Sequence, residues 1–333
     1  MRVMTSLGTL PLRGAGDRAA AAEAAGFDGV TTQENRHDPF LPLGAAALTT
    51  ERVSLATNVL IAFPRSPMVV ANAAWDLQAM SGGRFVVGLG SQVRGHIVRR
   101  FSSEWRAPAQ KMREYVQSLR AIFDCWANGE PLSYEGEHYQ FSLMTPNFTP
   151  EPLEMAPPPI RIAAVGPLMM RVAAEECDGV MLHGFATRAY LENQVLPNIR
   201  ATLDQRGVDA ADFEISGGGF VATGATQADV DRMYEWIRQR VGFYGSTPSY
   251  WPVFEEHGLE DLGRRLNTMS KAGEWDEMTA LIEDDVVDLF CAKGTHDTIA
   301  GAIEERFGGL VDTVSLDAST PASVVEEVSS VGG

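Results

Sequence analysis

The chain has 333 residues, of which 45% are hydrophobic and 21% charged, with 32 glycines and 3 cysteines. This composition excludes a disordered chain, a collagen-like fibre and a disulfide-stabilised scaffold. The net charge of −17 argues against a nucleic-acid partner. No stretch is long and apolar enough to span a membrane and no secretion signal is visible, so we expect no membrane partner and a cytoplasmic location.

The charge is unevenly distributed. Residues 1–120 carry 14 Arg and Lys against 9 Asp and Glu, whereas the remaining residues are strongly acidic. An anionic ligand should therefore bind near the first third of the chain. Five arginines in or after the third and fourth predicted strands could bind carboxylate or phosphate, and a solvated basic face is the alternative. They are Arg65, Arg84, Arg94, Arg99 and Arg100.

Apolar strands alternate with helices along the chain. Strands are predicted over residues 3–9, 27–32, 53–60, 85–90, 160–165, 180–183, 213–223 and 311–316. Helices are predicted up to residue 25 and over 42–49, 67–80, 108–127, from 167, 190–206, 226–240 and 295–306. Two similar segments, 21–30 and 173–180, each join a helix to a strand through a glycine-bearing turn, as repeated parallel βα units require.

This alternation predicts an α/β fold, a TIM (β/α)8 barrel that forms a single domain over residues 1–320. An open doubly wound sheet is the alternative, but it calls for a GxGxxG turn after the first strand, which Gly14–Asp17 lacks. Insertions are expected near 130–158 and 242–288, as lids or walls of the barrel mouth. They include the proline-rich segment Pro146–Pro159. Residues 321–333 are expected to form a loosely ordered tail.

In such a barrel the functional residues lie where strands end and loops begin. Polar side chains and glycines occupy these places at 33–36, 58–63, 90–96 and 164–167, and His183 follows the sixth strand. Gly166–Pro167 begins a helix whose N–H groups could bind phosphate, although proline also suits the first helical position for structural reasons. No HExxH, Cys/His cluster or GxSxG motif occurs, so no metal ligand is expected.

Several motifs, in their order and spacing, resemble the bacterial luciferase-like monooxygenase superfamily. They are Ala24–Val30, Glu34–Phe40, Leu55–Pro67, Ser81–Phe85, Gly88–Gly90 and Ala163–Pro167. Gly90–Val93 with His96 and Arg99–Phe101, together with Phe243–Pro248, resemble an actinobacterial branch of coenzyme F420-dependent oxidoreductases. The resemblance implies a TIM barrel and hydride transfer between the deazaflavin F420 and a small organic substrate.

The resemblance also implies positions for the site residues. The deazaflavin ring would lie against a bulge with a non-proline cis peptide at Asn58–Val59. Further cofactor contacts would come from Ser91 and Gln92 after the fourth strand and from Ala164, Val165, Gly166 and Pro167 after the fifth. Their places after strands, rather than the resemblance, make Glu34 and His96 the catalytic candidates and Phe63 and His183 candidates for the substrate pocket, although His183 could equally be a core histidine.

Relatives often carry an acidic or histidine pair where this chain has Gln33–Asn35, so the acid–base residue stays open. A carboxyl group such as that of Glu34 needs a buried environment to act as an acid near neutral pH. Two other functions remain: an FMN-dependent two-component monooxygenase, and a cofactor-free barrel that acts as a binding or structural subunit. FMN also carries a phosphate, so the basic first third suits either cofactor. Luciferase-like barrels commonly dimerise, and a homodimer is expected.

Overall fold

The computed structural model describes residues 1–8 and 11–332. They form two compact units, which are described separately. The N-terminal unit comprises Met4–Ala163 and Arg171–Val180. The C-terminal unit comprises Met1–Val3, Ala164–Met170 and the chain from Met181 onward. The single domain over 1–320 stays a prediction. None of the helices within these described residues is long and apolar enough to cross a bilayer.

The main sheet of the described residues has the strand order β3-β2-β1-β13-β10-β9-β8-β5-β4, and β3 also pairs with β5. This additional pairing closes a ring of eight strands, to which the short β4 is attached. The strands are β1 (Arg2–Ser6), β2 (Gly29–Thr32), β3 (Ser54–Thr57), β4 (Leu60–Ile61), β5 (Phe85–Gly90), β8 (Ile160–Ala164), β9 (Gly179–Leu182), β10 (Glu214–Gly217) and β13 (Thr313–Ser315). The closed ring confirms the predicted barrel, and the open-sheet alternative is wrong.

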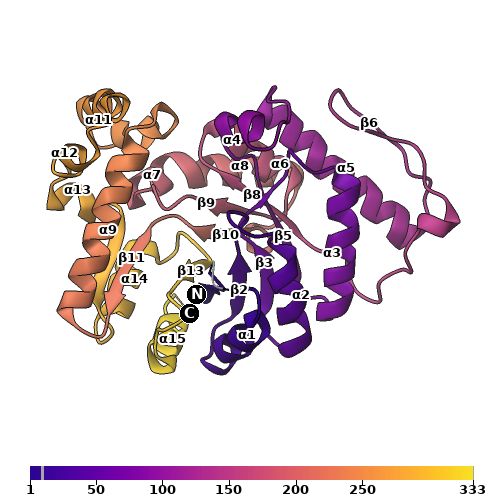
Figure 1. Cartoon of the computed structure of the whole chain (residues 1–333), viewed down its shortest axis with the longest axis horizontal. Helices are drawn as coiled ribbons and strands as arrows, with labels where there is room; N and C mark the ends of the chain where they lie inside the picture. Colours follow the sequence, from indigo (N-terminus) through magenta and orange to yellow (C-terminus); the bar gives the residue numbers. More distant parts are fainter. Residues whose placement is uncertain (9–10, 333) are drawn as a thin grey trace. The chain divides into compact units, whose positions relative to one another are not determined.

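Helices of the N-terminal unit pack against one another in chain order: α1 against α2, α2 against α3, and α3 against α5 (Figure 1). The side chain of Ser66 caps α3, Pro67 occupies its first position, and Gly82 ends it with a φ of 64°. The elements of this unit are α1 (Ala15–Ala24), α2 (Phe40–Thr49), α3 (Pro67–Ser81), α4 (Arg94–Arg99), α5 (Pro108–Asn128), β6 (Tyr134–Glu135), β7 (Gln140–Phe141), the 3-10 turn η1 (Pro146–Phe148) and most of α6 (Pro167–Glu176).

The proline-rich segment Pro146–Pro159 lies partly at the opposite end of the strands from the predicted site. The side-chain amide of Gln78 donates to the carbonyl oxygen of Ala156 at 2.9 Å and accepts from the N–H of Phe85 at 3.0 Å. Because Phe85 is the first residue of β5, this end of the segment lies beside the amino end of that strand. The expectation that the whole segment is a lid is therefore wrong.

In the C-terminal unit, the predicted strand 213–223 is two strands. Gly217 and Gly218 have φ values of 83° and 93°, which few other residues adopt, and they separate β10 from β11. A Cβ at Gly217 would lie 2.6 Å from the carbonyl oxygen of Leu182, so a side chain does not fit. β11 instead pairs in parallel with β12, with Phe220 opposite Cys291.

The remaining elements of the C-terminal unit are mostly helices, several of which pack against this small sheet (Figure 1). They are α7 (Arg188–Tyr190), the π-helical turn η2 (Leu191–Val195), α8 (Leu196–Arg206), η3 (Ala210–Asp212), β11 (Phe220–Gly224), α9 (Gln227–Gly245), η4 (Pro248–Tyr250), α10 (Trp251–Glu255), α11 (Glu260–Ala272), α12 (Trp275–Thr279), α13 (Asp284–Asp288), β12 (Cys291–Thr295), α14 (Ile299–Phe307) and α15 (Ala322–Ser329).

Two segments are more regular than the sequence suggested. Residues 242–288, expected to be irregular, form short helices that pack against α9 around a second core with the buried Phe254 and Phe290. The expected loose tail is wrong as well, because α15 buries Val324, Val325 and Val328. The amino group of Met1 donates to the carbonyl oxygen of Val331 at 2.8 Å.

Candidate functional site

Glu34 follows β2 and joins it to the segment after β3. Its Oε2 accepts the N–H of Ile61 and its Oε1 accepts from Nη2 of Arg65, each at 2.9 Å. Its own N–H donates to the carbonyl oxygen of Val59 at 3.0 Å. The carboxylate is only 7% exposed, and both oxygens have donors. This arrangement fits a residue that positions the backbone, and the predicted catalytic role stays untested.

Arg65 is shared between two carboxylates. Its Nη2 lies 2.9 Å from Asp38 Oδ2 and the same distance from Glu34 Oε1. Burial lowers the pKa of Arg65, but the bonds to Glu34 and Asp38 outweigh it, so the pKa is raised. Its charge is therefore neutralised by protein groups, and Arg65 is a weak candidate for binding an anion.

The other four arginines have different environments. Arg84 donates to the carbonyl oxygens of Thr50 and Val53, just before β3 begins, and is a structural residue. Arg100 donates to the carbonyl oxygen of Asn35 at 2.6 Å. Arg94 and Arg99 lie exposed on α4, where no carboxylate of the described residues pairs with them. Of the five predicted arginines, Arg94 and Arg99 remain available to an anionic ligand.

At the predicted cofactor site, the backbone at Asn58–Val59 lies close to the backbone at Gly90. The Asn58–Val59 peptide bond is cis, as the resemblance implied. A Cβ at Gly90 would lie 2.5 Å from Cγ2 of Val59, so this approach requires glycine. Between β3 and β5, the hydroxyl of Thr57 donates to the carbonyl oxygen of Gly88 at 2.8 Å and accepts its N–H at 2.9 Å.

The segment after β5 bends at Gln92. This residue has a φ of 56°, and its side-chain oxygen accepts the N–H of Val93 at 2.9 Å. The hydroxyl of Ser91 donates to the carbonyl oxygen of Gln92 at 3.2 Å. His96 lies on the short helix α4, which was not predicted, and its side chain is exposed. No bond among the described residues links His96 to Glu34.

Phe63 lies in a closed aromatic cluster. It is 6% exposed, and its ring centroid lies 5.9 Å from that of Trp105 and 5.1 Å from Nζ of Lys111. Burial lowers the pKa of Lys111. The hydroxyl of Tyr115, one helical turn further along α5, is buried without a partner in the described part of the chain. Sequence analysis missed Lys111 and Tyr115, although their i, i+4 spacing predicts one helix face.

In the C-terminal unit, the turn 164–167 leads into α6. A Cβ at Gly166 would meet no atom within 4 Å. The carbonyl oxygen of Gly166 accepts the N–H of Met170 at 3.0 Å, and the first turn of α6 has no acidic side chain. The free N–H groups at such a helix start attract anions. The helix start suggested a phosphate here and the resemblance suggested contacts with the cofactor, and both stay predictions.

His183 follows β9 and is packed among aromatic rings. Its ring centroid lies 4.3 Å from that of Tyr244 and 5.0 Å from that of Tyr250. Both tyrosines belong to the insertion 242–288, so this part of the insertion lies against a predicted site residue. Ala164, Val165 and His183 line the same small cavity, of about 10 Å³. The structure therefore brings His183 together with two residues that were predicted after a different strand.

The match to a protein-family model decides the family. The family model for luciferase-like monooxygenases matches residues 2–313. The chain belongs to this luciferase-like monooxygenase family.

Two sequence relatives and two solved structures are similar to this chain. An uncharacterised protein of Mycobacterium tuberculosis is 46% identical over 309 residues, 92% of this chain and 91% of that protein. An F420-dependent glucose-6-phosphate dehydrogenase of Nakamurella multipartita is 33% identical over 202 residues, 57% of this chain and 58% of that protein. The coenzyme F420-dependent tetrahydromethanopterin reductase of Methanopyrus kandleri has the same fold, with a TM-score of 0.79, 18% identity, and coverage of 99% of this chain and 97% of that one.

Another structure with this fold is a type II Baeyer–Villiger monooxygenase, the oxygenating constituent of 3,6-diketocamphane monooxygenase of Pseudomonas putida, in complex with FMN. It has a TM-score of 0.65 and 16% identity, with coverage of 99% of this chain and 97% of that one.

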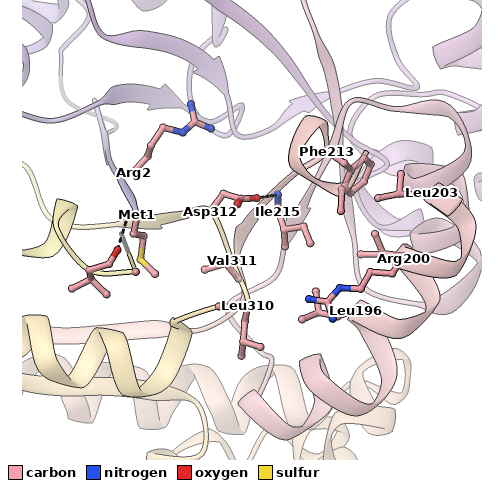
Figure 2. A pocket seen from close by; sticks show the side chains of 15 residues that line it. Met1, Arg2, Leu196, Arg200, Leu203, Phe213, Ile215, Leu310, Val311 and Asp312 are labelled. Carbon is pink, nitrogen blue, oxygen red and sulfur yellow. Dashed lines mark hydrogen bonds between the residues drawn. The ribbon is translucent and has the colours of Figure 1, made fainter. Parts of the chain in front are cut away.

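A second cavity in this luciferase-like chain lies away from the predicted site. It has a volume of about 450 Å³, and its lining includes Met1, Phe213, Leu310 and Val311 (Figure 2). Asp312, also in its lining, precedes β13, and its Oδ2 accepts the N–H of Ile215 in β10 at 2.7 Å. The cavity thus lies where these strands begin. In TIM barrels this end serves stability, and the active site lies at the other end.

Proposed function

We propose that this protein is a coenzyme F420-dependent oxidoreductase that moves hydride between the deazaflavin and a small organic substrate. An F420-dependent relative supports this choice of cofactor. The observation that carries the proposal is the close approach of Val59 to Gly90 at the carboxyl ends of their strands, where only a glycine fits. Coenzyme F420, when bound, supplies a carbon centre that gives or accepts hydride.

The residues of the N-terminal unit suit one side of a flat ring. Glu34 holds the backbone at Ile61 and Val59, and Thr57 holds Gly88, so the ring would meet a surface that needs no rearrangement. Preorganisation of this kind lowers the free-energy cost of binding. Arg94 and Arg99 on α4 would offset the repulsion between an anionic cofactor and a chain of net charge −17.

The residues of the C-terminal unit suit a phosphate or the ring edge. Gly166 leaves open space where other residues carry a Cβ, and Pro167 begins α6 without using an N–H group. Ala164 and Val165 would lie on the side of this turn that faces the deazaflavin ring. His183 would face the substrate, with Tyr244 and Tyr250 excluding water from it.

A titration of the purified protein with each cofactor tests the proposal. Saturable quenching of the deazaflavin fluorescence by the wild-type protein, together with no uptake of FMN, is the expected result. The variant Gly166→Val should weaken F420 binding at least tenfold, whereas Gly44→Ala on α2, another glycine whose Cβ would meet no atom, should leave it unchanged. Binding of FMN alone would overturn the proposal.

The FMN-dependent two-component monooxygenase remains the second candidate, because an FMN-bound monooxygenase shares the fold. It predicts that FMN binds and that a separate reductase is needed for turnover. Failure to bind either cofactor would favour the third candidate, a binding or structural subunit without a cofactor. A small-molecule substrate and a homodimer, which size-exclusion chromatography with light scattering would detect, are part of the proposal.

A further inference from the structure

The tautomer of His183 is fixed by its own loop. The backbone N–H of Phe185 donates to Nδ1 of His183 at 2.9 Å. A nitrogen that accepts a hydrogen bond carries no proton, so the proton of the neutral ring resides on Nε2. Directly after β9, the chain therefore holds the imidazole as an N–H donor with a defined direction.

The surroundings of this ring keep it neutral. The rings of Tyr244 and Tyr250 pack against it, and no carboxylate or cation of the described residues forms a hydrogen bond or ion pair with it. Burial lowers the pKa of His183 to about 4. A doubly protonated ring would also lose the bond from Phe185, because Nδ1 would then be a donor. The hydrogen bond from Phe185 and the packing around the ring thus both favour the neutral imidazole.

The Nε2–H group has no partner within residues 1–8 and 11–332. The cavity that His183 lines is apolar apart from Tyr190, and its volume of about 10 Å³ accommodates a single water-sized atom. Ala164 and Val165, at the turn proposed to contact the cofactor, line it too. His183 is half-buried and its Nε2–H group is accessible, so an oxygen acceptor on a ligand can take the place of the water that this donor would otherwise bind.

We propose that His183 binds a carbonyl oxygen of the bound ligand through its Nε2–H group, and that the substrates are carbonyl compounds or the corresponding alcohols. This inference rests on the proposed function. Two oxygens share this chemistry: a carbonyl of the deazaflavin ring system and the carbonyl of the substrate. A hydrocarbon offers no acceptor and would leave the donor unpaired.

The role of His183 in such a reduction is electrostatic. The carbonyl carbon accepts hydride, with its two electrons, from the reduced deazaflavin, and the π electrons of the C=O bond move to oxygen. His183 donates a hydrogen bond to this oxygen as its negative charge develops, and a proton from water completes the alcohol. The imidazole keeps its proton, because a neutral ring is too weak an acid to release it. In alcohol oxidation the same bond orients the hydroxyl oxygen.

Nitrogen-15 NMR of the imidazole tests the tautomer without any cofactor. Between pH 5.5 and 8, His183 is expected to show one neutral form protonated at Nε2. Cyclohexanone should shift the Nε2–H resonance, in cofactor-free or cofactor-loaded protein, and cyclohexane should not. A proton on Nδ1, a doubly protonated ring at pH 7, or no response to both cyclohexanone and cofactor would overturn the inference.

Two variants identify which oxygen is bound. His183→Phe keeps the ring shape and removes the donor, whereas His183→Gln keeps an N–H donor. If the substrate oxygen is the acceptor, His183→Phe should weaken cyclohexanone binding at least tenfold, with F420 affinity unchanged and partial rescue in His183→Gln. If the cofactor carbonyl is the acceptor, F420 affinity should fall instead, with the same rescue. Equal affinities in all three proteins would overturn the inference, whereas failure of wild-type protein to bind F420 overturns only the proposed function.

Discussion

The N-terminal and C-terminal units place different chemistry after their strands. In the N-terminal unit, Glu34 is paired with Arg65 and hydrogen-bonded to Ile61, and Val59 packs on Gly90. In the C-terminal unit, His183 lies among aromatic rings, and its described contacts include no ion pair. In the N-terminal unit, an ion pair and hydrogen bonds fix the backbone around Glu34. In the C-terminal unit, the packed rings leave the Nε2–H group of His183 pointing in a defined direction. Changes in the first unit should therefore act on stability, and changes in the second on protonation and ligand binding.

The largest effect is expected at Gly90. The variant Gly90→Ala places a Cβ 2.5 Å from Cγ2 of Val59, and this branched side chain cannot move away without shifting its backbone. Overpacking of this kind destabilises a protein by about 1–3 kcal/mol. Urea unfolding measures the loss, and Val59→Ala in the Gly90→Ala background should restore at least half of it.

Gly166→Ala is the matched control in the C-terminal unit, because its Cβ meets no atom within 4 Å. Its free energy of unfolding should change by less than about 0.5 kcal/mol. Equal losses in Gly90→Ala and Gly166→Ala, or no rescue by Val59→Ala, would show that the approach of Val59 to Gly90 is not what constrains this position.

A somewhat smaller loss is expected for Glu34→Gln. The amide oxygen still accepts the N–H of Ile61, but Arg65 then keeps only Asp38 as its anionic partner. We expect a loss of about 1–2 kcal/mol in urea unfolding, because the Glu34 carboxylate is 7% exposed. Glu137→Gln removes an ion pair to Arg106 whose side chains are 54% and 60% exposed, and should cost no more than about 0.5 kcal/mol.

The same variant separates the two roles of Glu34. A positioning residue predicts a less stable protein with weaker F420 binding and a turnover number that falls only modestly. A general acid predicts normal stability and normal F420 affinity with turnover reduced at least a hundredfold. The second pattern would restore the catalytic role that the sequence suggested.

The sequence predicted the strands well where burial alone defines them. Phe85–Gly90 is an uninterrupted apolar run, typical of a strand covered on both faces, and its predicted bounds match β5. The split between β10 and β11 was missed because it depends on a contact with the carbonyl oxygen of Leu182, which is distant in the sequence from Gly217. Helix α15 was missed because the small polar residues around its valines obscured a three-valine apolar stripe.

For the candidate site, the sequence predicts which residues follow the strands but not the contacts that surround them. The order of strands and loops is enough to name Glu34, Asn58, Gln92 and His183 as residues after strands. It does not reveal that both oxygens of Glu34 are bound, or that Tyr244, from a later insertion, packs against His183. Such environments come from tertiary contacts, which one sequence does not encode in any local pattern.

The third prediction concerns pH and acts in the C-terminal unit. Burial lowers the pKa of His183 to about 4, below the value of about 6.5 that an unfolded chain has. Above pH 6.5 the ring is neutral in both states. As the pH falls from 6.5 towards 4, the unfolded chain takes up a proton that the folded chain does not, so stability decreases by up to about 1 kcal/mol per pH unit.

This loss should be absent from His183→Gln and His183→Phe, because neither side chain titrates. The measurement is the difference in the free energy of unfolding between wild type and each variant at several pH values from 4.5 to 7.5. As the pH falls, the free energy of unfolding of the wild type should decrease relative to that of each variant, by the same amount for both variants. A difference that is constant with pH would mean that the packing around His183 does not restrict its protonation.

The smallest effect is expected for Lys111→Met in the N-terminal unit. Lys111 is 9% exposed, and the hydrogen bond that holds its ammonium group is a long one of 3.5 Å to the carbonyl oxygen of Glu104. Methionine keeps the length of the side chain and removes a poorly solvated charge, so the stability should stay the same or rise by up to about 1 kcal/mol. The control is Arg113→Met, which breaks the pairs of Arg113 with Glu175 and Glu176 and should destabilise the protein.

A Lys111→Met variant as unstable as Arg113→Met would contradict this expectation and make the ammonium group a structural element of the Phe63 cluster. A stable Lys111→Met variant means that the N-terminal unit retains a buried cation that its own folding does not need. In that case the comparison of the two units becomes sharper, because each would hold one polar group without an adequate partner: an ammonium on α5 and an imidazole N–H after β9. The affinities of Lys111→Met and His183→Phe for F420 and for cyclohexanone would then show which ligand each group serves.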